Sequence, residues 1–89
     1  MLHLETTPRF DRRLVVFIKA HPDLRERTRV LIDRLAASPF DPRNKVHKLG
    51  GKLRAFWGAN ITWSYRITFL LEKERIVLIN VGPHDEVYR

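Results

Sequence analysis

The stretch that most constrains the fold is residues 55–82, "AFWGANITWSYRITFLLEKERIVLINVG". It is rich in aromatic and β-branched side chains, which favour strands over helices. A charged turn at 72–74, Glu-Lys-Glu, separates its last two apolar runs. The stretch therefore predicts three consecutive antiparallel strands.

Alternation along 64–71 assigns side chains to two faces of this sheet, because successive strand residues point to opposite sides. One face is apolar and consists of Tyr65, Ile67, Phe69 and Leu71. The other carries Ser64, Arg66, Thr68 and Leu70. We expect the apolar set to pack against helices and Arg66 to stand on the open face. A central-strand arginine with no obvious acidic partner suggests ligand binding, and a solvated sheet face is the alternative.

The N-terminal half predicts a short strand followed by a pair of helices. Residues 1–7, "MLHLETT", alternate apolar and polar side chains. Thr7 and Pro8 form a helix start, with threonine as N-cap and proline at the first helical position. The next apolar stripe is Phe10, Leu14, Phe17 and Ile18, and a second stripe is Leu24, Thr28, Leu31, Ile32 and Leu35. The break between them, where a helix restarts at Pro22, predicts a helical hairpin.

Together these segments predict an α+β fold in a single domain spanning 1–89. The expected order is an N-terminal strand, a two-helix hairpin, a three-stranded antiparallel sheet and a short C-terminal tail. Residues 38–54 lose periodicity, so a long loop is expected between hairpin and sheet. A chain of 89 residues has room for one domain with a thin core.

The chain is strongly basic, with 17 Lys and Arg against ten Asp and Glu and a net charge of +7. A small domain with this charge is expected to bind nucleic acid or an acidic protein, and a generally solvated basic surface is the alternative. The lack of cysteine excludes disulfides and thiolate chemistry. With no apolar signal core and no apolar run of membrane-spanning length, a soluble cytoplasmic protein is expected.

A basic loop at 45–54, "KVHKLGGKLR", is the first candidate site. Its four cations, suited to RNA phosphates, are Lys45, Lys48, Lys52 and Arg54. His47 differs from these neighbours because an imidazole exchanges protons near neutral pH. Gly50 and Gly51 allow the backbone to turn sharply or to approach a ligand.

The C-terminal stretch "GPHDEVY" is the second candidate site. If the residues after Gly82-Pro83 form a helical turn, His84 and Tyr88 lie one turn apart on the same side. The imidazole suits proton transfer, and the phenol suits stacking on a base or holding a phosphate oxygen. Asp85 is expected to point to solvent. The alternative is that His84 is an ordinary surface residue and Tyr88 covers the core.

The predicted topology brings these candidates together. The basic loop enters the first strand of the sheet, the tail leaves the last, and Arg66 lies on the strand between. One open sheet face is therefore expected to gather His47, Arg66, His84 and Tyr88. These groups suit RNA cleavage in which the 2′-hydroxyl attacks phosphorus while side chains transfer protons and stabilise charge. No cofactor is expected, because the acids form no Mg²⁺ cluster and the scattered histidines lack metal-site spacing.

Residues 47–88 resemble the second half of the RelE/ParE superfamily of bacterial type II toxins, and most closely its mRNA-cleaving RelE and YafQ-like branch. The shared pattern is a "kL.G.l.g.w" stretch, a strand with an arginine, an apolar strand, and a terminal "vG.H..vY". In this chain the corresponding residues read "HKLGGKLRAFWGANITWSYRITFLLEKERIVLINVGPHDEVY". The strand-helix-helix-sheet order agrees over nearly the whole chain.

The resemblance implies roles for individual residues. His84 matches the tail histidine of YafQ-like enzymes, a proposed acid or base, and Tyr88 matches their terminal aromatic. His47 matches a histidine before the "L.G" element, and Arg66 matches the strand arginine of RelE-type relatives. The residues that match the family's basic loop loosely are Lys48, Lys52 and Arg54.

The chain departs from the family around its second strand. YafQ-like sequences often carry a histidine and an aspartate there, whereas this chain has Asn60 and Ser64. RelE-type members act with basic groups and a tyrosine instead, so the resemblance to that branch still implies catalysis.

As a whole, the resemblance implies a toxin that cleaves mRNA in the ribosomal A site and is controlled by an acidic antitoxin protein. Two alternatives stay open. One is a ParE-like toxin that inhibits DNA gyrase by protein contact, and the other is a non-catalytic RNA- or ribosome-binding module. His84 and Tyr88 favour the ribonuclease, because a pure inhibitor needs no titratable pair.

Overall fold

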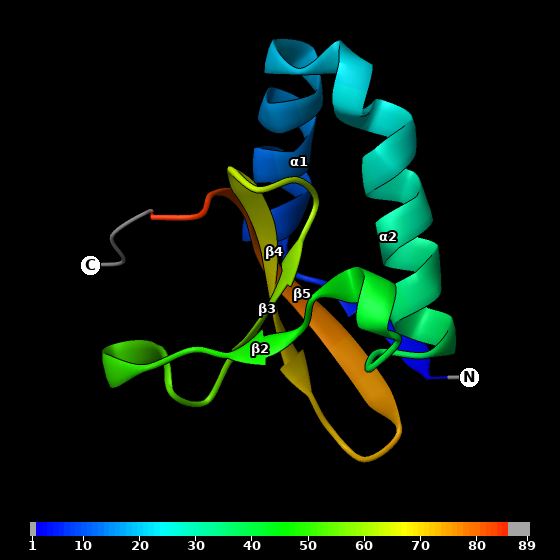
Figure 1. The fold of residues 1–89 in the computed structure, drawn as a ribbon, viewed down its shortest axis with the longest axis vertical. Helices are drawn as coiled ribbons and strands as arrows, with labels where there is room; N and C mark the ends of the chain where they lie inside the picture. The colour runs from blue at the N-terminus through cyan, green and yellow to red at the C-terminus, as the bar shows by residue number, and fades with distance from the viewer. Residues whose placement is uncertain (1, 86–89) are drawn as a thin grey trace.

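The computed structural model describes residues 2–85, in which α1 and α2 pack on one side of a sheet (Figure 1). The elements are β1 (His3–Thr6), α1 (Pro8–Ala20), η1 (Pro22–Leu24), α2 (Arg25–Ala37), η2 (Pro42–Asn44), β2 (His47–Lys48), η3 (Gly51–Leu53), β3 (Trp57–Asn60), β4 (Tyr65–Leu71) and β5 (Arg75–Pro83). The predicted α+β class and the helical hairpin are confirmed. In the described part of the chain, neither helix has the length and apolar character needed to cross a bilayer.

The sheet has more strands than predicted. Within residues 2–85 it contains five, in the order β1-β5-β4-β3-β2. β3, β4 and β5 are the predicted antiparallel strands. Residues 72–74 connect β4 to β5, as expected. β1 belongs to the same sheet and runs parallel to β5. The chain between these two strands passes through both helices and through β2, β3 and β4, which is ample length for the crossover that a parallel pair needs. β2 lies in the predicted loop, where two residues are too few to show strand periodicity.

The helix starts follow from local chemistry. The Thr7 hydroxyl caps α1 by accepting a hydrogen bond from a first-turn backbone N–H at 3.1 Å, and Pro8 occupies the first helical position, as predicted. The predicted break at Pro22 is also present. The α-helical part of the second helix begins only at Arg25, because residues 22–24 form a 3₁₀ turn.

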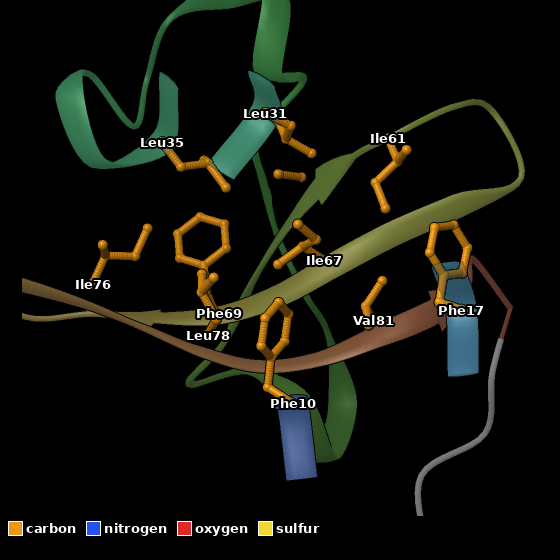
Figure 2. Close-up of a cluster of buried hydrophobic side chains, with 11 residues drawn as sticks. Phe10, Phe17, Leu31, Leu35, Ile61, Ile67, Phe69, Ile76, Leu78 and Val81 are labelled. Carbon is orange, nitrogen blue, oxygen red and sulfur yellow. The ribbon is translucent and has the colours of Figure 1, made fainter. Parts of the chain in front are cut away.

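The core lies between α1, α2 and one side of the sheet, which we call the apolar face (Figure 2). Its buried side chains are Phe10, Phe17, Leu31, Leu35, Ala59, Ile61, Ile67, Phe69, Ile76, Leu78 and Val81. Ile67 and Phe69 of β4 are fully buried, and Tyr65 and Leu71 pack against them, so the predicted core face is confirmed. Burial of each large apolar side chain contributes about 1.5–3 kcal/mol to folding.

The opposite side of the sheet, which we call the polar face, carries Gly58, Asn60, Arg66, Thr68 and Asn80. Residues directly opposite one another in neighbouring strands share a face, which defines this set. The prediction that this face is open is wrong, because Arg66 is only 8% exposed and Thr68 only 1%. Part of the cover comes from the β2 segment, since His47 and Leu49 lie over Gly58.

Candidate functional site

Two histidines that are far apart in the sequence meet at the polar face. His47 belongs to β2, and His84 directly follows β5. Their ring centroids are 5.8 Å apart and the ring planes differ by 24°, so the two imidazoles stack. The predicted approach of the basic loop to the C-terminal tail is therefore present at these two residues.

Local contacts hold both histidines in place. His47 Nδ1 lies 3.0 Å from the Lys45 carbonyl oxygen. Because a carbonyl only accepts, Nδ1 carries the hydrogen of the neutral ring and Nε2 is left as its proton acceptor. The backbone N–H of His84 donates to the Ser64 carbonyl at 2.8 Å, which ties the turn after β5 to the β3–β4 connection. Gly58 makes room for the ring of His47, since a Cβ at position 58 would lie 3.3 Å from it.

Arg66 lies on the same face, opposite Asn60 and Gly82 in the strand register. None of the carboxylates in residues 2–85 forms an ion pair with it. Its Nε is buried and has no hydrogen-bond partner among these residues. Burying a charged donor without a partner costs free energy. The Arg66 guanidinium is therefore suited to receive an anion.

A pocket of about 340 Å³ opens beside His84. Its lining residues are Asn60, Trp63, Ser64, His84 and Asp85. Asp85 is exposed, as expected, but it also contributes to this pocket. Trp63 is not among the predicted site residues. Its place in the turn between two predicted strands is the signal that could have indicated it, because turns favour small polar residues over aromatic ones.

The basic loop takes a smaller part in this arrangement than predicted. After β2 the chain projects away from α1 and α2 (Figure 1). Lys52 and Arg54 line a separate depression of about 590 Å³. The Lys48 ammonium lies over the indole of the first β3 residue, 4.7 Å from the ring centroid, and Lys45 has a left-handed backbone with φ of 51°. Phosphate binding by these four cations stays a prediction.

Tyr88, the fourth predicted catalytic residue, lies outside the described residues, as does most of the predicted C-terminal turn. Among residues 2–85, no three His, Asp or Glu side chains come together in a way that would hold a metal ion. The groups that the polar face and the pocket present include two imidazoles, a guanidinium, two amides, a carboxylate, hydroxyls and an indole. This set is suited to proton transfer, anion binding and stacking.

No family model matches the sequence, and no curated protein matches it significantly. Solved structures of bacterial toxins, in contrast, share its fold. YafQ from E. coli strain BL21(DE3) matches with a TM-score of 0.81 and 16% identity over 94% of each chain. A YoeB/ParE toxin from Agrobacterium tumefaciens gives 0.79 and 20% identity, over 93% of this chain and 99% of the toxin. A metal-bound toxin from Helicobacter pylori gives 0.80 and 26% identity, over 99% and 100%.

A further match is a structure of the E. coli DinJ–YafQ toxin–antitoxin complex, with a TM-score of 0.78 and 18% identity over 93% of this chain and 92% of the matched chain. The chain therefore has the fold of RelE/YafQ-type toxins. The resemblance in its sequence is confirmed at the level of the fold.

Proposed function

We propose that this chain, on its RelE-type toxin fold, is the toxin of a type II toxin–antitoxin system and an endoribonuclease that cleaves mRNA on the ribosome in the cytoplasm. The observation that carries the proposal is the stacking of His47 on His84 at 5.8 Å, on the face that buries Arg66. Cleavage needs a proton acceptor, a proton donor and a cation near one phosphate. This face offers one group for each task.

In the proposed reaction, Nε2 of His47 takes the proton of the ribose 2′-hydroxyl, since its Nδ1 is held 3.0 Å from a carbonyl oxygen. The 2′-oxygen forms a bond to phosphorus while the bond from phosphorus to the 5′-oxygen breaks. Protonated His84 gives its proton to the departing 5′-oxygen. The products are a 2′,3′-cyclic phosphate and a 5′-hydroxyl end.

Arg66 has the remaining task, which is to stabilise the charge that builds on the non-bridging phosphate oxygens. Its Nε is buried and has no hydrogen-bond partner in the described chain, so it has lost the hydrogen bond to water that an exposed Nε would make. An oxygen of an incoming phosphate replaces that hydrogen bond. The scheme requires no metal ion, because side chains perform both proton transfers and balance the charge.

An acidic antitoxin is the proposed protein partner. The net charge of +7 favours association with a negatively charged protein. The DinJ–YafQ complex gives a precedent for antitoxin binding by a toxin of this fold. A groove of about 620 Å³ between α1 and α2 offers such a partner apolar contacts from Leu14, Ile18 and Ile32, and its lining also carries three carboxylates and two guanidinium groups.

Primer extension on ribosome-bound mRNA tests the proposal. We expect cuts that persist in EDTA and that leave 2′,3′-cyclic phosphate ends. His3→Ala should cut like the natural chain, because His3 lies on β1 at the other edge of the sheet from β2. Uncut mRNA together with inhibited DNA gyrase supercoiling would favour the ParE-like alternative. Tight ribosome binding without cuts would favour the non-catalytic module.

A further inference from the structure

Trp63 occupies an unusual position for a large aromatic residue. It lies in the turn between β3 and β4, and it is 91% exposed. Among residues 2–85, the next most exposed large apolar side chain is Val16, at 65%. Keeping an indole in water forfeits the free energy that its burial would contribute. Exposure of this kind next to a pocket points to a ligand that covers the ring.

The turn that carries Trp63 is held in place by backbone hydrogen bonds. The N–H of Ile61 donates to the Tyr65 carbonyl at 2.9 Å. The carbonyl of Ser64 accepts from the backbone N–H of His84 at 2.8 Å, so the turn is fastened to the tail. A platform that is already ordered lets a flat ligand stack with little loss of conformational entropy.

The pocket beside Trp63 suits a neutral polar ligand better than a phosphate. Its volume of about 340 Å³ is at the small end for ligand sites. None of its described lining residues is Lys or Arg, and Asp85 brings a carboxylate that repels phosphate. Asp85 supplies exposed acceptor oxygens, and Asn60 adds an amide whose Oδ1 is buried and has no hydrogen-bond partner within residues 2–85. Such acceptors match the amino groups on base edges.

We infer that this pocket binds one unstacked nucleobase of RNA, stacked on the Trp63 indole and bonded through its exocyclic amino group to Asn60 and Asp85. Adenine, cytosine and guanine carry an exocyclic amino group, and uracil does not. Stacking combined with edge recognition is how proteins read single-stranded RNA. His84 lines the same pocket, so the bound base lies next to the scissile phosphate. The inference rests on the proposed ribonuclease function and adds the part of the substrate that the site recognises.

Binding of 2′-O-methyl hexamers tests this inference apart from cleavage, because the methyl group blocks attack by the 2′-oxygen. In a Trp57→Phe chain, Trp63 is the remaining tryptophan of the two in the sequence, so its fluorescence reports stacking. We expect adenosine and cytidine hexamers to quench this emission and a uridine hexamer to bind more weakly.

Substitution of Trp63 in the otherwise natural chain gives the second readout. Trp63→Ala should weaken binding of the adenosine hexamer roughly 5- to 150-fold, the range for one base stacked on an aromatic side chain. Trp63→Phe should keep part of the affinity. Phe40→Ala is the matched control, because Phe40 is an aromatic residue that is 58% exposed and lies outside the pocket.

Three results would overturn the inference while leaving the ribonuclease proposal in place, provided that mRNA is still cut. The first is that Trp63→Ala binds the adenosine hexamer as tightly as the natural chain does. The second is that hexamers bind the Trp57→Phe chain without changing its tryptophan emission. The third is that the adenosine, cytidine and uridine hexamers bind with equal affinity. Loss of antitoxin binding by Trp63→Ala at unchanged hexamer affinity would also overturn it and assign the indole to a protein surface. If the natural chain neither binds a hexamer nor cuts mRNA, the ribonuclease proposal fails together with the inference.

Discussion

β4 buries side chains on both faces of the sheet, but the two faces provide different surroundings. On the apolar face, Ile67 and Phe69 are fully buried among other apolar side chains of α1, α2 and the sheet. On the polar face, Arg66 and Thr68 are 8% and 1% exposed. Side chains on both faces of β4 are thus buried. Burial stabilises Ile67 and Phe69, but it disfavours the charged guanidinium of Arg66.

The other arginines show how unusual this burial is. Arg29 pairs with Glu26, and Arg75 pairs with Glu5, in each case with side chains that are well exposed. Exposed pairs of this kind contribute little to stability. Burial makes Arg66 the arginine that most needs a partner, yet none of residues 2–85 supplies one for its Nε. The apolar face is therefore optimised for folding, whereas the polar face retains the energetic cost of a buried guanidinium Nε, which the proposed binding of an anion would offset.

The largest effect should come from breaking the apolar face. Phe69→Ala should lower the free energy of unfolding by about 3–5 kcal/mol, because it removes a buried ring and leaves a cavity. Urea denaturation measures this loss. Val16→Ala is the matched control on α1, where the side chain is 65% exposed, and it should change the value by less than about 0.5 kcal/mol. A Phe69→Ala chain of natural stability would mean that the core does not depend on this ring.

The next largest effect should come from the polar face and should appear in activity alone. His84→Ala should reduce mRNA cleavage ~10²–10⁴-fold, the usual consequence of losing one general acid or base. The free energy of unfolding should stay near that of the natural chain, because His84 is exposed. Cleavage at the natural rate by a folded His84→Ala chain would remove this residue from the mechanism.

Several parts of the apolar face could be predicted because periodicity encodes burial. The stripe beginning at Phe10, the Thr7 cap and the inward side of β4 all follow from spacing and local chemistry. The polar face was harder to predict. Alternation assigned Arg66 to the correct side of the strand, but it carries no information on what covers that side. β2 was missed because two residues show no period.

The candidate site was predicted in part for similar reasons. Chain order indicated that His47 and His84 could meet, since one precedes the sheet and the other follows it. Trp63 was not identified, because an aromatic residue in a strand-rich stretch suggests core, and only the turn geometry leaves it 91% exposed. Residues brought together by a turn and a tail leave no periodic pattern in the sequence.

A smaller effect, of opposite sign to Phe69→Ala, is expected from replacing the buried charge. Arg66→Met should leave the free energy of unfolding unchanged or raise it by ~1–4 kcal/mol, as happens when apolar side chains replace buried charges. Cleavage should be lost, and Arg66→Lys should recover only part, because lysine lacks the two-pronged contact to phosphate. Denaturation and primer extension on the same preparations separate the two effects. If Arg66→Met unfolds the protein, the arginine is a structural element and the comparison of the two faces fails.

The smallest effect is expected at a charge pair that lies on neither face of the sheet. Its two residues, Asp41 and Arg43, already bind each other. Asp41 accepts hydrogen bonds from the Arg43 backbone N–H at 2.9 Å and from its guanidinium at 2.7 Å. The side-chain hydrogen bond from Arg43 is the main cause that holds the pKa of Asp41 well below its ordinary value of 3.8. The pKa of Asp41 is lower in the folded chain than in the unfolded chain. The pair therefore stabilises the fold at pH values above 3.8, and this stabilisation is lost as the pH falls below 3.8.

Asp41→Asn should therefore be slightly less stable than the natural chain at about pH 7, and the difference in the free energy of unfolding between the two chains should narrow between about pH 4 and pH 2. High salt should narrow the gap as well, since the pair lies at the surface. Urea denaturation of both chains across this pH range measures the effect, and a gap that stays constant would show that the hydrogen bonds to Arg43 do not depend on the charge of Asp41.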